Sequence, residues 1–118
     1  MNMPKEVLIV SYGPAFSEAV SEPFKNLQDV HFSVAGNLSD GLAILTEGNV
    51  DLLIIDYAIV LDSALSNFLS SPSIGKMPIV LVAQEKKFLD GFNEPNMSKF
   101  SRNELDSRVI PFVRNILV

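Results

Sequence analysis

The segment LSDGLAILTEGNVDLLIID, residues 38–56, contains the pattern that decides the fold. Its first half has apolar residues at helical spacing, Ser39 in a position that suits an N-cap, and Gly48 where a helix would end. Its second half, residues 52–55, is a continuous apolar run that stops at Asp56. Such a run is typical of a strand covered on both faces. The segment therefore predicts a helix followed by a buried strand of a parallel sheet.

The same alternation of strand and helix extends outward in both directions. Apolar runs or alternating patterns predict further strands at residues 7–10, 30–35 and 79–82. Helical patterns follow Pro14, cover residues 63–69, and begin again at Ser101, where Glu104 completes a capping-box pattern. Strands that alternate with helices require crossover connections. We therefore expect one α/β domain over residues 1–118, a doubly wound open parallel sheet of about five strands with helices on both faces.

The composition excludes several classes of function. The chain has 118 residues, 47% of them hydrophobic, and a net charge of −5, which argues against binding to nucleic acid or to an anionic membrane. It has no cysteine, and its one histidine is His31, so thiolate chemistry and histidine-based metal clusters are excluded. The N-terminus has no signal-peptide pattern, and we expect a cytoplasmic protein.

Four blocks of the sequence, taken in order, resemble the receiver domain of bacterial response regulators. They are VLIVSYGPAF (7–16), LSDGLAILTEGNVDLLIID (38–56), MPIVLVAQ (77–84) and MSKF (97–100). The resemblance covers essentially the whole chain. It implies that Asp56 stands at the phosphoacceptor position and Lys99 at the position of the lysine that pairs with the phosphoryl group.

The remaining receiver positions do not match. By the resemblance, the acidic pair that holds Mg²⁺ falls on Ser11 and Tyr12, whose hydroxyls are poor substitutes for carboxylates. The switch hydroxyl falls on Ala83, and the switch aromatic falls on Asn96. The segment from Ala83 to the MSKF block is also too short for a full fourth helix, which we expect to be shortened or missing. The chain is therefore similar to a degenerate receiver, a pseudo-receiver.

Three functional hypotheses follow. The first is a non-enzymatic, phosphorylation-independent interaction module without a cofactor, which binds a protein partner or a second copy through the region after the fourth strand. There Phe88 and Phe92 are expected to be exposed, beside a solvated helix face with Lys86 and Lys87. The second is a working receiver, phosphorylated at Asp56 by a histidine kinase with Mg²⁺. The third is a flavodoxin-like module for a small ligand, although no strand-end loop is rich enough in glycine to hold a phosphate.

Several side chains have alternative roles that the sequence leaves open. Lys99 either forms a structural ion pair with Asp56 or lies in solvent. The ring of Tyr12 either fills the pocket that lacks a metal, which we favour, or points outward. His31 is expected on the solvent side of its strand.

Overall fold

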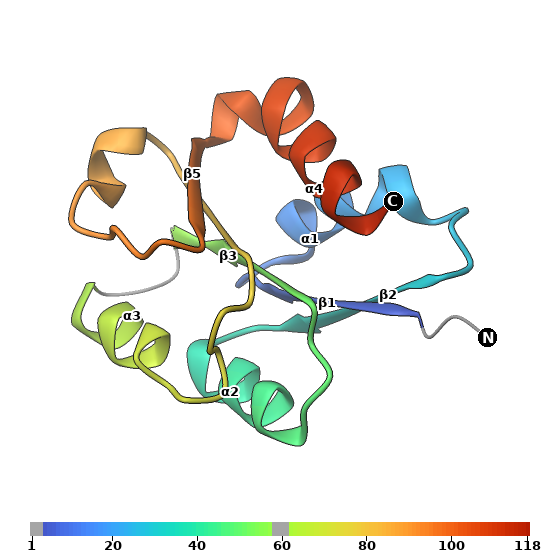
Figure 1. The fold of residues 1–118 in the computed structure, drawn as a ribbon. Coiled ribbons are helices and arrows are strands. Elements are labelled where there is room, and N and C mark those ends of the chain that lie inside the picture. The colour runs from blue at the N-terminus through green and yellow to red at the C-terminus, as the bar shows by residue number, and fades with distance from the viewer. Residues whose placement is uncertain (1–3, 58–61) are drawn as a thin grey trace.

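The computed structural model describes residues 4–57 and 62–118 and shows one parallel five-stranded sheet (Figure 1). The strand order is β2-β1-β3-β4-β5, and every neighbouring pair is parallel. The strands are β1 (Lys5–Val10), β2 (Val30–Ala35), β3 (Leu52–Asp56), β4 (Ile79–Ala83) and β5 (Met97–Ser101). The predicted fold class is confirmed.

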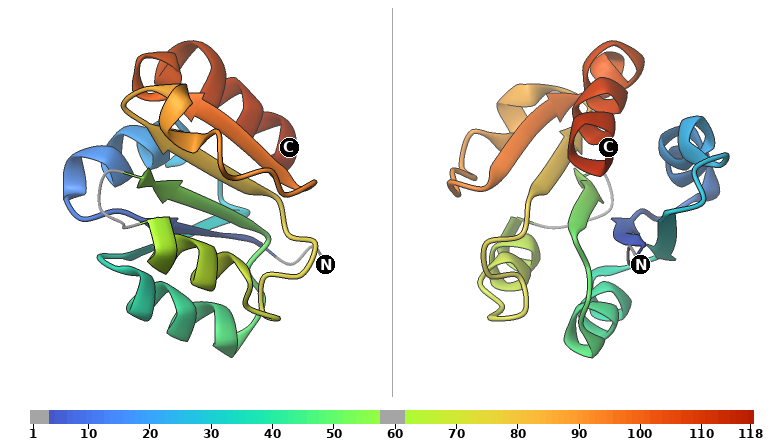
Figure 2. Two further views of the ribbon diagram at one scale, coloured as in Figure 1. Left: turned by 90° about the vertical axis from the view of Figure 1, so that its left-hand side faces the viewer. Right: turned by 45° about the vertical axis from the view of Figure 1, so that its right-hand side comes forward.

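Helices cover both faces of the sheet. Helices α1 and α4 lie on one face, and α2 and α3 lie on the other (Figures 1 and 2). Their bounds are α1 (Pro14–Ser21), α2 (Leu38–Glu47), α3 (Asp62–Leu69) and α4 (Ile110–Leu117). A short 3₁₀ helix, η1 (Glu22–Phe24), follows α1, so the chain leaves the α-helix just before Pro23, as the missing N–H of proline requires. No helix in the described part of the chain is long and apolar enough to cross a membrane.

Alternate residues of the central strands belong to two hydrophobic cores, one on each face of the sheet. On β1, Leu8 and Val10 face α2 and α3, whereas Val7 and Ile9 face α1 and α4. Strands β3 and β4 are buried along their whole length, which explains why they appear in the sequence as uninterrupted apolar runs.

The fourth helix of the expected pattern is reduced, as predicted. Between β4 and β5 the structure has only a 3₁₀ helix of four residues, η3 (Lys86–Leu89). Because β5 is the last strand of the sheet, Pro95 just before it removes no ladder hydrogen bond from a central strand.

The last helical segment changes type along its length. The predicted capping box is present: Ser101 and Glu104 bond each other at the start of the 3₁₀ helix η4 (Arg102–Glu104). A π-helical turn, η5 (Leu105–Val109), follows, and the regular helix α4 begins only at Ile110. Pro111 thus lies in the first turn of α4, where its missing N–H costs nothing, and the irregular turn lies before it.

Candidate functional site

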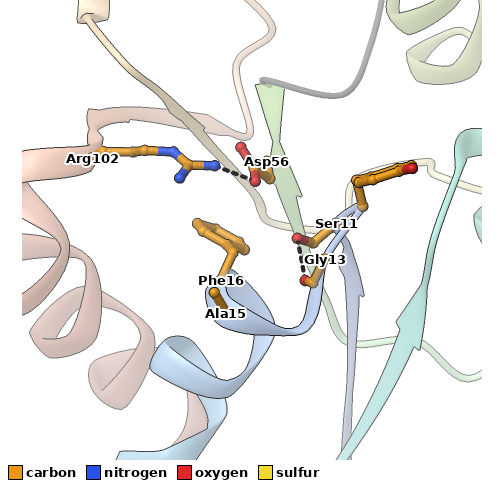
Figure 3. Close-up of a pocket in the computed structure, with 7 residues that line it drawn as sticks. Ser11, Gly13, Ala15, Phe16, Asp56 and Arg102 are labelled. Atoms are coloured by element: carbon orange, nitrogen blue, oxygen red, sulfur yellow. Dashed lines mark hydrogen bonds and ion pairs between the residues drawn. The ribbon is translucent and has the colours of Figure 1, made fainter.

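An open pocket lies at the carboxyl ends of β1 and β3, where ligands of parallel α/β sheets are bound. It has a volume of about 450 Å³. Figure 3 shows Asp56 and Arg102 directed toward each other above Phe16, with Ser11 at the end of β1. Its described lining residues are Ser11, Tyr12, Gly13, Ala15, Phe16, Asp56 and Arg102.

The central feature of the pocket is an ion pair between Asp56 and Arg102. Asp56 is the last residue of β3, and its side chain is only 4% exposed. The Nη2 group of Arg102 donates a hydrogen bond to Oδ2 of Asp56, and the guanidinium also lies over the Phe16 ring, 5.6 Å from its centre. The carboxylate is thus held by a cation supplied by the chain itself.

The capping box fixes the backbone that carries Arg102. Glu104 Oε1 accepts hydrogen bonds from the backbone N–H of Ser101 at 2.9 Å and from its hydroxyl at 3.1 Å. The backbone bond is the main cause that lowers the pKa of Glu104 below its ordinary value. Arg102 directly follows Ser101 inside this capping box, so its side chain leaves a turn of defined geometry.

Of the two alternatives left open for Lys99, the ion pair with Asp56 is not formed in the structure. Lys99 lies in the middle of β5 opposite Leu81, and its ammonium donates to the backbone carbonyl of Leu89 at 3.3 Å and to Oδ1 of Asn93 at 3.1 Å. Successive residues of a strand point to opposite faces of a sheet. Lys99 therefore points to the face of η3, whereas Phe100 packs against Phe112 on the α4 face, 5.5 Å between ring centres. Arg102, two residues after Phe100, lies on the side of the sheet to which the side chain of Asp56 points.

The prediction that the ring of Tyr12 fills the pocket is also wrong. Tyr12 is 83% exposed, whereas Ser11 before it is 2% exposed. The hydroxyl of Ser11 donates to the carbonyl of Gly13 at 3.2 Å, and its backbone N–H bonds the carbonyl of Ala35 at 2.9 Å. These bonds turn Ser11 inward at the strand end, and the alternation of an extended chain then turns Tyr12 outward.

Two residues assigned to the degenerate pocket lie elsewhere. Ala83 is fully buried in the core on the α2 and α3 side. Asn96 lies at the opposite end of β5: its side-chain amide donates to the carbonyl of Met77, and its backbone carbonyl accepts from Ile79 N–H at 3.0 Å. Neither is among the described residues that line the pocket, so the pocket combines Ser11, Tyr12 and Asp56 from the predicted set.

Of the two phenylalanines after β4 that were expected to be exposed, one is buried. Phe88 is 48% exposed, but Phe92 is 8% exposed and meets Tyr57 edge-on at 5.9 Å between ring centres. With so short a fourth helix, Phe92 fills the space beside the core. Lys86 and Lys87 lie in solvent, with Glu104 and Glu85 as their ion-pair partners.

The pocket does not fit a divalent metal ion. Mg²⁺ is held by several hard oxygen ligands, usually carboxylates. Of the described pocket residues, Asp56 supplies a carboxylate, and that carboxylate already bonds a guanidinium. In the part of the chain that the structure describes, no three acidic, histidine or cysteine side chains are grouped so that they could hold a metal.

No protein-family model and no curated protein matches the sequence. Solved structures do match: the signal receiver domain of an HD domain-containing protein from Pseudomonas fluorescens Pf-5 superposes with a TM-score of 0.75 at 16% identity, over 97% of this chain and 94% of that one. This chain has the receiver fold.

Two further receiver-fold structures were solved with a metal ion. The Mn²⁺-bound response regulator Rcp1 has a TM-score of 0.75 and 17% identity, over 97% of this chain and 95% of its own. TrrA from Thermotoga maritima, solved with Mg²⁺ and BeF, has a TM-score of 0.71 and 17% identity, over 96% and 99%. At this identity, the superpositions establish the shared fold alone.

Arg102 is a charged pocket residue that was not predicted from the sequence. A signal for it was present in the sequence, since it lies two residues after the MSKF block and inside the capping-box pattern. The resemblance instead assigns the cation to Lys99, which the alternation along β5 directs to the other face of the sheet.

Proposed function

We propose that this chain is a pseudo-receiver of a two-component type signalling system, which acts as a phosphorylation-independent protein interaction module. The observation that carries the proposal is the ion pair between Asp56 and Arg102. A phosphoacceptor carboxylate must attack a phosphorus atom, and a carboxylate that bonds a guanidinium is less available for this step.

The rest of the pocket supports the same proposal. Phosphoryl transfer relies on cations that neutralise the charge developing on the phosphoryl oxygens, and removal of a metal costs several kcal/mol of transition-state stabilisation. Ser11 and Tyr12 replace the acidic pair, and the hydroxyl of Ser11 is already used as a donor to Gly13. Ala83 has no hydroxyl to bind a new phosphate. The proposed role is therefore non-enzymatic and needs no cofactor.

The partner surface we propose is the region after β4. Phe88 is its exposed aromatic residue, with Lys87 5.8 Å from the ring centre. Because Phe92 belongs to the core, the contact would depend on Phe88 and the short helix η3 rather than on a pair of exposed rings. A protein partner suits this surface better than nucleic acid, since the chain carries a net charge of −5.

The test is whether the protein responds to a phosphoryl analogue. Its melting temperature would be measured with Mg²⁺ and beryllofluoride, and its intact mass after incubation with acetyl phosphate. TrrA serves as the positive control for the first measurement, because it was solved with that analogue. Asp56→Asn serves as the control for the second.

We expect no shift in melting temperature and no gain of a phosphoryl group. A shift with beryllofluoride, or a mass gain that Asp56→Asn abolishes, would instead establish the working receiver that a histidine kinase phosphorylates at Asp56.

A further inference from the structure

The outer edge of β2 lacks the lysine, proline and acidic residues that often prevent one sheet from pairing with another. β2 is an end strand of the sheet, and β1 is its strand neighbour (Figure 2). Its sequence, VHFSVA, contains no lysine, no proline and no acidic residue. Natural edge strands commonly carry lysine, proline or a bulge that blocks pairing with another chain. Val34 on this strand is 52% exposed.

The backbone of β2 presents a regular row of free groups to the outside. Lys5 N–H bonds the carbonyl of Asp29 at 2.7 Å, and Ser11 N–H bonds that of Ala35 at 2.9 Å. In a parallel pair, alternate residues direct both backbone groups toward the neighbouring strand. With Lys5 in register with Val30, the odd-numbered residues of β2 bond β1. Residues 30, 32 and 34 therefore direct their N–H and C=O groups away from the sheet.

We propose that β2 pairs antiparallel with β2 of a second copy of this chain, about a twofold axis at Phe32. In this register Phe32 lies opposite Phe32 of the second copy, and Val30 lies opposite Val34. Each such pair exchanges both of its outward backbone hydrogen bonds. The exposed side chain of Val34 is covered by Val30 of the other copy, and β-branched and aromatic cross-strand pairs of this kind are favourable. The two sheets become one continuous sheet in a closed dimer.

The opposite edge of the sheet does not allow the same contact. The carbonyl of Asn96 accepts from Ile79, so the outward residues of β5 are Met97, Lys99 and Ser101. A twofold axis at the centre of β5 would place Lys99 against itself, and like charges directly opposite are destabilising. The outward N–H of Ser101 is already bonded to Glu104. The β2 edge thus has free outward backbone groups and no like charges at its centre, whereas the β5 edge does not.

This dimer goes beyond the proposed function and does not depend on the pair of Asp56 and Arg102. The region after β4 lies at the other edge of the sheet and stays accessible in the dimer. Each copy carries a net charge of −5, so the copies repel each other at low ionic strength. We expect association to become tighter as salt is added.

The first test is the mass of the protein in solution, measured by sedimentation equilibrium over about a hundredfold range of concentration. Wild type should shift from monomer to dimer. Val34→Pro removes an N–H that points outward and is not used by β1, so it should weaken association by about tenfold or more. Val34→Thr keeps the strand and the N–H, and should associate like wild type. A wild type that stays monomeric, or equal association of the two variants, would overturn the proposal.

The second test needs no variant and checks the register. Amide hydrogen exchange of wild type is measured at low and at high concentration. The amides of Phe32 and Val34 should exchange rapidly in dilute protein and slowly in concentrated protein, whereas His31 and Ser33, bonded to β1, should be protected at both. Unchanged exchange at Phe32 would contradict β2 pairing, even if the protein dimerises.

Discussion

Removal of the Arg102 guanidinium should destabilise the fold measurably. In wild type the side chain of Asp56 is 4% exposed at the end of β3, and Arg102→Ala removes its ion pair with Arg102. A largely buried carboxylate that loses one of its charged partners is more costly to keep in the folded state, so stability falls. The contact of the guanidinium with the Phe16 ring is lost in the same variant.

The magnitude follows from the geometry of the pocket. A hydrogen bond to a charged group contributes about 1.5–3 kcal/mol, and a partly exposed cation over an aromatic ring about 0.5–1 kcal/mol. The pocket is open and Arg102 is 41% exposed, so water can solvate the carboxylate in the variant and reduce the loss. Asp56 also retains other interactions. We expect a loss of about 2 kcal/mol, or about 6–10 °C in melting temperature for a chain of this size.

Urea unfolding of the variant checks this value, and a double-mutant cycle isolates the pair. The cycle uses Arg102→Ala, Asp56→Asn and the double variant, and its coupling energy should be about 1–1.5 kcal/mol. Arg108→Ala is the matched control, because Arg108 also pairs with a carboxylate but is 66% exposed, and it should cost at most about 0.5 kcal/mol. If Arg102→Ala costs no more than Arg108→Ala, or if the coupling is zero, the ion pair does not hold the pocket together.

Two further predictions concern the capping box and the region after β4. The folded state lowers the pKa of Glu104, so its charged form contributes stability above its ordinary pKa of 4.5, which is lost as pH falls through the folded value. Glu104→Gln should therefore be less stable than wild type at neutral pH, and the difference should shrink in acid; a constant difference in urea titrations from pH 7 to about pH 3 would refute the assignment. Phe92→Ala should cost about 3 kcal/mol because the ring is buried, whereas Phe88→Ala should cost less than about 0.5 kcal/mol; similar urea midpoints for both would show that Phe92 is not a core residue.

Four of the five strands and the main helices were predictable because their signals are local, whereas β5 (Met97–Ser101), which has no apolar run, was not marked by its own pattern. Buried strands in a parallel sheet appear as apolar runs, and the blocks ending at Val10, Asp56 and Ala83 were each found within one or two residues of their observed ends. The start of α2 was less exact: Asn37, not Ser39, is the N-cap, and its side chain accepts from Asp40 N–H at 2.8 Å. Both residues can cap a helix, and the sequence does not show which of them keeps a non-helical backbone.

The pocket was harder to predict because it depends on which face each strand residue occupies. Lys99 and Arg102 are three positions apart, and an error of one residue in a strand reverses every side chain. Once Phe100 is placed on the α4 face, Lys99 must lie on the other face. This placement requires knowing which helix packs against each face of β5. The same reason explains Tyr12, whose direction follows from the buried bond that Ser11 makes with Gly13.

The two side-chain links of β5 have a mechanical consequence. At its amino end, the amide of Asn96 bonds the carbonyl of Met77 before β4, and just past its carboxyl end Arg102 bonds Asp56 on β3. An edge strand without a full helix to cover it is thereby linked at one end to the segment before β4 and at the other end, across β4, to β3. Because β5 can slide along β4 only if both links break, we expect this edge of the sheet to keep a fixed position.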